Sequence, residues 1–136
     1  MSRAYQLFIV LALLALLAAC ERPGDSGRAR VAAGRALSGT LAYPRSTPVT
    51  VAAGEEAAQL TMTSQDSLPV IVAWFRRALQ LNGWVIQREA TGPAGDVTLY
   101  AQKGDRPLWI TLRANVGAAG TTYTMIGEIP ADSTRR

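Results

Sequence analysis

The sequence contains no histidine and only one cysteine, Cys20, among its 136 residues. Without histidine, the chain has no Ser-His-Asp or Cys-His catalysis, no imidazole acid–base chemistry and no zinc site of the usual kinds. A single cysteine cannot form a disulfide bond within the chain. No glycine-rich phosphate-binding loop follows a predicted strand. These absences exclude most of the common catalytic and metal-binding classes.

The remaining routes to catalysis depend on carboxylates or on one lysine. The acids that could form a glycosidase-like pair are Glu55, Glu56, Asp66, Asp96 and Asp105. Each stands at a position where turns and helix caps favour acidic residues. Lys103, the only lysine, precedes a predicted tight turn where a solvated charge is ordinary, although a Ser–Lys pair stays open. We therefore expect no enzyme, no cofactor and no metal site.

The first residues have the layout of an export signal. Arg3 precedes an uninterrupted apolar run from Leu7 to Leu17, and the small residues Ala18 and Ala19 follow. A transmembrane helix needs roughly 20 apolar residues, so this run is too short to span a bilayer. Residues 1–19 are therefore predicted to be a signal peptide that is removed.

Cys20 stands directly after this signal. Leu17-Ala18-Ala19-Cys20 resembles the lipobox of bacterial lipoproteins, in which the cysteine is the first residue of the mature chain. The resemblance implies that Cys20 carries diacylglycerol on its sulfur and an acyl chain such as palmitate on its amino group. Two or three chains hold a protein on a bilayer where one would not. The alternative is an unmodified cysteine in a signal helix that is cut elsewhere.

The residue after the cysteine bears on location. It is Glu21, and not the aspartate that resembles an inner-membrane retention signal in enteric bacteria. We therefore expect a lipid-anchored protein of the bacterial cell envelope, at the outer membrane and facing the periplasm.

Residues 20–42 are rich in arginine, alanine, glycine and serine and show no helical or strand period. We predict a lipidated, flexible, basic tether that holds a domain, residues 43–130, roughly 25 Å from the anchor. A short tail, residues 131–136, ends the chain. Positive and negative side chains are equal in number in the domain, so the net charge of +4 comes from the ends. A basic segment beside a lipid anchor favours a membrane partner over nucleic acid, with a merely soluble spacer as the alternative.

A helix is the clearest element of the predicted domain. Asp66 or Ser67 supplies its N-cap, Pro69 falls in its first turn, and Gly83 follows its end. Trp84 is expected to return against the last turn, as in a Schellman motif. Apolar side chains at helical spacing form the predicted buried face: Leu68, Ile71, Val72, Phe75 and Leu79, widened by Val70, Trp74 and Leu81.

Strands are predicted where apolar and polar residues alternate. They cover residues 58–63, 84–88, 97–103, 106–113 and 121–129. Gly104-Asp105 predicts a two-residue hairpin turn, and the resulting register pairs Tyr100 with Trp109 on one face and apolar residues on the other. The predicted fold class is α+β, a single antiparallel sheet of about five strands with one helix packed across one face, in the order β-α-β-β-β.

The domain also carries a pattern of short motifs. They are Tyr43-Pro44, Thr63-x-x-Asp66-Ser67, Val72-x-Trp74-Phe75 and Gly83-Trp84. The pattern resembles that of small bacterial envelope lipoproteins, for which no activity is settled. The resemblance supports the fold and the location, and it implies no catalytic or binding residue.

Three functions stay open from the sequence. The first is a non-catalytic interaction or envelope-maintenance domain with a protein partner, whose candidate contact face is formed by Tyr100, Trp109 and Arg113. The second is a binder of a small or lipidic ligand between helix and sheet. The third, and least favoured, is an enzyme of carboxylate type. If another part of the chain covered Trp109, we would expect contacts at the helix edge, at Trp74 and Arg77.

Overall fold

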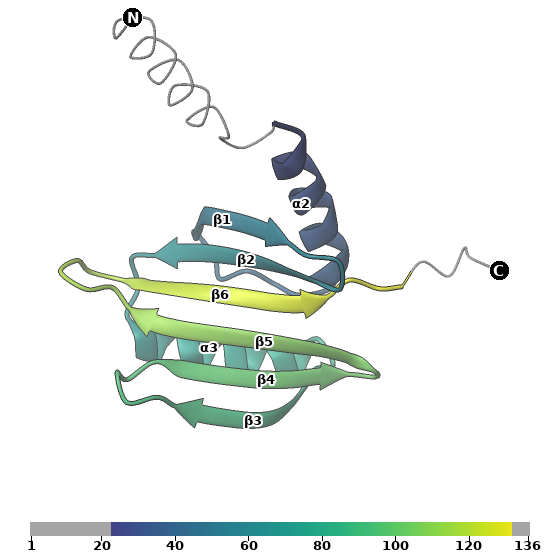
Figure 1. Cartoon of the computed structure of the whole chain (residues 1–136). Helices are drawn as coiled ribbons and strands as arrows, with labels where there is room; N and C mark the ends of the chain where they lie inside the picture. The colour runs from purple at the N-terminus through teal and green to yellow at the C-terminus, as the bar shows by residue number, and fades with distance from the viewer. Residues whose placement is uncertain (1–22, 132–136) are drawn as a thin grey trace, which may run out of the picture.

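The computed structural model describes residues 23–131 as two α-helices and a six-stranded sheet (Figure 1). In chain order the elements are α2 (Pro23–Ala36), β1 (Thr47–Ala53), β2 (Ala57–Ser64), α3 (Leu68–Leu81), β3 (Val85–Thr91), β4 (Val97–Lys103), β5 (Arg106–Ala114) and β6 (Thr121–Glu128). Every strand is antiparallel to its neighbours, and the order across the sheet is β1-β2-β6-β5-β4-β3. β1 and β3 are therefore the two edges.

The prediction of five strands and one helix is wrong, although the α+β class is correct. The additional strand is β1, which pairs with β2 along one edge. Its pattern is weak because it contains a proline and a bulge, which falls between Pro48 and Thr50. The additional helix is α2, which occupies residues 23–36 where a flexible tether was predicted.

α3 begins and ends where the sequence predicted. Ser67 is the N-cap residue, although its side chain makes no capping hydrogen bond. Gly83 has a φ of 78°, and the Trp84 N–H donates to the Leu79 carbonyl at 2.9 Å, which is the predicted Schellman motif. The prediction for Val70 and Leu81 is wrong, since both are exposed on the side of the helix away from the buried stripe.

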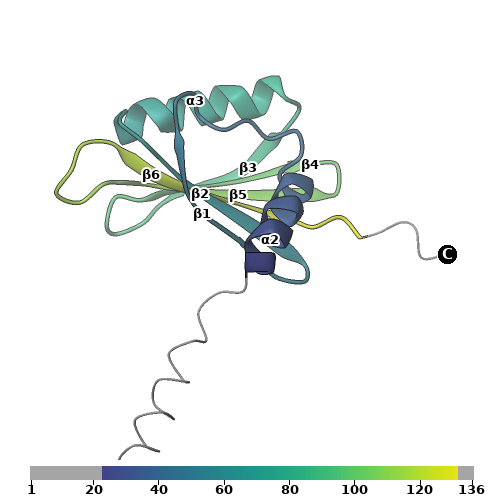
Figure 2. The ribbon, with the colours of Figure 1, turned by 90° about the horizontal axis from the view of Figure 1, so that it is seen from above.

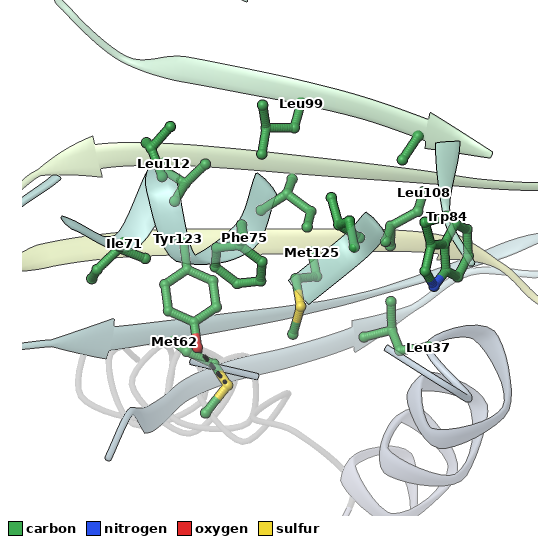
Figure 3. Close-up of a cluster of buried hydrophobic side chains, with 14 residues drawn as sticks. Leu37, Met62, Ile71, Phe75, Trp84, Leu99, Leu108, Leu112, Tyr123 and Met125 are labelled. Carbon is green, nitrogen blue, oxygen red and sulfur yellow. Dashed lines mark hydrogen bonds between the residues drawn. The ribbon is translucent and has the colours of Figure 1, made fainter. Parts of the chain in front are cut away.

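The main core lies between α3 and the sheet (Figure 3). The Phe75 ring of α3 packs edge-on against Tyr123 of β6, with 5.1 Å between ring centroids. Tyr123 is fully buried, and burial raises the pKa of its hydroxyl. That hydroxyl donates to the Ser46 side chain and accepts from the Tyr43 N–H at 3.0 Å. The core thus fixes the segment that leads into β1.

α2 packs on the same face of the sheet as α3, but over β1 and β2. It has no broad apolar stripe, and its contacts with the sheet use small side chains. Ala33 and Ala36 are buried against Ala58, and Leu37, directly after the helix, joins the main core. β6 carries Gly127 at this point, where an added Cβ would lie 2.6 Å from the Ala36 carbonyl oxygen. The helix therefore approaches the sheet closely.

No helix within residues 23–131 covers the opposite face of the sheet; α3 lies along one side only (Figure 2). The predicted register of the β4–β5 hairpin is confirmed, with Tyr100 opposite Trp109 and Thr98 opposite Thr111. We call this uncovered side the open face.

Candidate functional site

A cavity of about 590 Å³ lies between α2 and β1. Its walls are mostly apolar and include Leu37 beside α2, Val49 of β1, and Leu60 and Met125 from the inner strands. The volume is in the range of ordinary small-molecule pockets. Sequence reasoning missed this site because it predicted neither α2 nor β1.

The spacing of residues in α2 explains why a cavity remains. Ser26, Arg30 and Ala33 recur at helical spacing and line the cavity. Ala36 lies on the neighbouring stripe, which is packed on the sheet. Gly34 also lines the cavity, and a Cβ added there would meet nothing within 4 Å. The helix is thus held close to the sheet at one side while small residues leave space at the other.

Among the described residues, Arg30 is the only charged one that lines this cavity. Its side chain is exposed and has no hydrogen-bond or ion-pair partner within residues 23–131. A guanidinium group at the edge of an apolar cavity suits a ligand that combines an apolar body with an anionic head.

Arg106 of β5 holds the C-terminal end of α2. Its guanidinium donates to the carbonyl oxygens of Ala36 at 3.1 Å and Ser38 at 3.0 Å. The same group lies over the Trp84 ring, 5.7 Å from its centroid. Carbonyls at a helix C-terminus lack partners within the helix, so a cation that binds them stabilises that end.

The predicted contact residues lie together on the open face. Tyr100 and Trp109 are stacked, with ring centroids 5.2 Å apart. Arg113 is exposed and lines a depression of about 280 Å³ together with threonines of β2, β5 and β6. Two of these threonines, Thr61 and Thr124, are hydrogen-bonded to each other at 2.9 Å. The open face therefore combines two stacked aromatic rings, several threonine hydroxyl groups and the guanidinium of Arg113, which has no partner within residues 23–131.

The two alternative contact residues on the helix edge, Trp74 and Arg77, differ in how exposed they are. Trp74 is half-buried, with its ring packed edge-on against Tyr43 and Phe75 at centroid distances of 5.3 Å and 5.0 Å. Arg77 is exposed. Trp74 therefore serves mainly to attach the segment before β1 to α3.

The candidate catalytic acids are divided between several places. Glu55, Glu56 and Asp105 line one wide depression near the β4–β5 turn, together with Glu128. Asp66 accepts a hydrogen bond from the Tyr43 hydroxyl at 2.5 Å, and this bond raises the pKa of Tyr43. Within residues 23–131, no three His, Cys, Asp or Glu side chains are grouped so that they could hold a metal ion.

The two remaining candidate catalytic residues, Asp96 and Lys103, lie in or next to turns. Asp96 lies beside Gly92 at the turn between β3 and β4. Lys103 is exposed, and its side chain passes close to Gly83. Within residues 23–131, no hydrogen bond or ion pair joins either of them to another candidate catalytic group, so we assign them no chemistry.

The predicted lipidation site, Cys20, lies outside the described residues. Between residues 23 and 131, neither helix is long and apolar enough to cross a bilayer.

The protein is an α+β domain in which two helices pack on one face of an antiparallel sheet and a mostly apolar cavity lies between one helix and the sheet. A family model described as START domain-like matches residues 45–121, and the chain belongs to this family. Comparison with curated proteins and with solved structures finds no match. The matched segment contains α3 and β1 to β5 but not α2. One wall of the cavity is therefore built by a helix outside the matched segment.

Proposed function

We propose that this protein is a bacterial lipoprotein, anchored through Cys20, whose periplasm-facing domain binds an apolar ligand in the cavity between α2 and β1. The cavity itself is the observation that carries the ligand-binding part of the proposal. Membership in the START domain-like family also favours ligand binding over catalysis. The lipobox at the end of the signal and an outer-membrane location rest on the sequence alone.

The energetics suit a short acyl chain or a similar apolar group. Each buried methylene contributes about 0.8 kcal/mol, so roughly eight of them would gain about 6 kcal/mol before the costs of association. A gain of about 6 kcal/mol corresponds to a dissociation constant of about 40 μM, and the costs of association weaken it, so we expect affinities in the high micromolar to millimolar range for a simple fatty acid.

Two glycines of α2 provide a matched test of this site. The chain from residue 21 onward would be titrated with a fluorescent dodecanoic acid. Gly34 lines the cavity and Gly27 does not, and at both positions an added Cβ meets nothing within 4 Å. Gly34→Leu should weaken binding at least tenfold because its side chain fills the cavity, whereas Gly27→Leu should leave binding unchanged. Equal binding by both variants, or no saturable binding by the parent chain, would refute the site.

A second candidate function is a protein contact through Tyr100, Trp109 and Arg113. The observation that favours it is the open face, where no described helix covers these side chains. A stacked cross-strand pair also stabilises a hairpin by itself, by about 0.5–1.5 kcal/mol. Mutation separates these two roles: loss of a protein contact removes the bound partner, whereas loss of hairpin stabilisation lowers the melting temperature.

A photoreactive residue at Thr111, between Tyr100 and Arg113 on this face, would test the contact in cells. We expect one discrete crosslinked partner that is lost in Trp109→Thr and in Arg113→Ala while the melting temperature of Arg113→Ala is unchanged. The same photoreactive residue at Val85, on the β3 edge, is the control. If Trp109→Thr lowers the melting temperature but the adduct persists, the pair only stabilises the hairpin.

A further inference from the structure

The distance between the anchor and α2 is short. Only Glu21 and Arg22 separate Cys20 from Pro23, the first residue of α2. Consecutive Cα atoms are about 3.8 Å apart, so Cys20 and Pro23 are at most about 11 Å apart. α2 is itself packed on the sheet. A lipid on Cys20 would therefore hold the domain itself near the headgroups, and not at the end of a long tether.

The direction of α2 then decides which part of the domain faces the membrane. Its C-terminal end is fixed near β6 by the contacts of Ala36 with Arg106 and Gly127. Its N-terminal end lies on the β1 side of the sheet, away from β3 (Figure 1). The β1 edge is therefore closest to the anchor, and the β3 edge is farthest from it.

The side chains at this end suit an anionic bilayer. Arg28 and Arg30 are exposed in the N-terminal half of α2, where Asp25 is the only described acid. β1 has no charged residue. Val31 of α2 is 66% exposed and Val49, at the bulge of β1, is 56% exposed. Arginines attract anionic headgroups, and apolar side chains beside them can enter the interfacial region.

We propose that the N-terminal half of α2 and the edge strand β1 dock on the anionic bilayer that holds the anchor, so that the cavity opens toward the membrane and takes its ligand from it. This inference rests on the proposed function for its anchor and its ligand. Val49 and Arg30 both line the cavity, so the surface that meets the lipid is also the rim of the site. An acyl chain can then pass from the bilayer into the cavity while Arg30 binds the anionic headgroup.

The two edges of the sheet allow a matched test. Val49 on β1 and Val85 on β3 are exposed to a similar degree, 56% and 60%. Lipidation consumes Cys20, the only cysteine, so a single reporter cysteine can replace either valine. The lipidated protein, labelled with nitrobenzoxadiazole, would be reconstituted into vesicles of phosphatidylethanolamine and phosphatidylglycerol that contain a nitroxide-labelled lipid.

We expect quenching at Val49→Cys to be at least threefold stronger than at Val85→Cys. The double change Arg28→Glu and Arg30→Glu should remove most of this difference, and Arg88→Glu on β3 should not. Equal quenching at both edges, stronger quenching at Val85→Cys, or recovery of the mature protein without lipid would overturn the docking geometry.

Failure of the docking and failure of the ligand site can be told apart. Titration of the anchor-free chain with fluorescent dodecanoic acid depends on the cavity and not on the anchor. Strong quenching at Val49→Cys without saturable dodecanoic acid binding would support the docked orientation and refute the ligand site. Saturable binding of dodecanoic acid with equal quenching at the two edges would support the ligand site and refute the docked orientation.

Discussion

Replacement of Gly127 by alanine tests whether α2 belongs to the folded domain. The new Cβ would lie 2.6 Å from the Ala36 carbonyl oxygen and 3.2 Å from a methyl group of Leu37. Because the closest atom belongs to the backbone, the end of α2 must move by several tenths of an ångström. Overpacking of this kind costs about 1–3 kcal/mol. Alanine in a strand recovers roughly 0.5–1 kcal/mol relative to glycine, so a net loss of about 1–2 kcal/mol is expected.

Gly27→Ala is the control for this change, because it has the same chemistry without the collision. Gly27 lies inside α2, and an added Cβ there meets nothing within 4 Å. Alanine in a helix interior is favoured over glycine by about 1 kcal/mol, so this variant should be more stable than the parent if α2 is part of the fold.

Urea denaturation and amide hydrogen exchange would measure both variants. We expect Gly127→Ala to lower the free energy of unfolding and to speed exchange in α2 before it does so in α3. If Gly127→Ala stabilises the chain as much as Gly27→Ala does, α2 is not packed against β6, and the cavity loses one of its walls.

Three further predictions concern the anchor, the core and one surface ion pair. Cys20→Ala should abolish labelling with a palmitate analogue and leave an unprocessed or soluble form; recovery of fully soluble wild-type protein would contradict the anchor. Phe75→Ala should cost about 3–5 kcal/mol of stability, and an unchanged melting temperature would count against the packing of α3. The hydrogen-bonded pair with Arg76 lowers the pKa of Glu89, so the pair stabilises the fold above the unfolded carboxyl pKa and loses this effect as pH falls through the folded value. Glu89→Gln should therefore be less stable than wild type at pH 7 and closer to it near pH 3, and a stability gap that is independent of pH would contradict this.

Local signals in the sequence were sufficient for α3 and for the central hairpin. A proline in the first turn, a glycine after the last turn and apolar residues at helical spacing together specify α3, and Gly83 and Trp84 lie as predicted. The Gly104-Asp105 turn, together with strict alternation, fixed the register that places Tyr100 opposite Trp109. These features depend on residues that are neighbours in the chain.

The ligand site was not predictable in the same way. Residues 23–36 have three glycines, Gly24, Gly27 and Gly34, and no broad apolar stripe, so their local preference for a helix is weak. α2 is stabilised by partners distant in sequence: the small residues Ala58 and Gly127, and the guanidinium of Arg106. β1 is likewise completed by pairing with β2 and by the contacts that fix the segment before it.

The sequence by itself determined the α+β class, the limits of α3 and the register of the hairpin, while the signal and its lipobox stay predictions. It did so because each depends on the order and spacing of nearby residues. Only the tertiary structure decided that a second helix packs beside the first, that a sixth strand closes one edge, and that a cavity lies between them. The physical reason is that small side chains carry little pattern along the chain, yet they determine how closely a helix and a sheet approach each other in space.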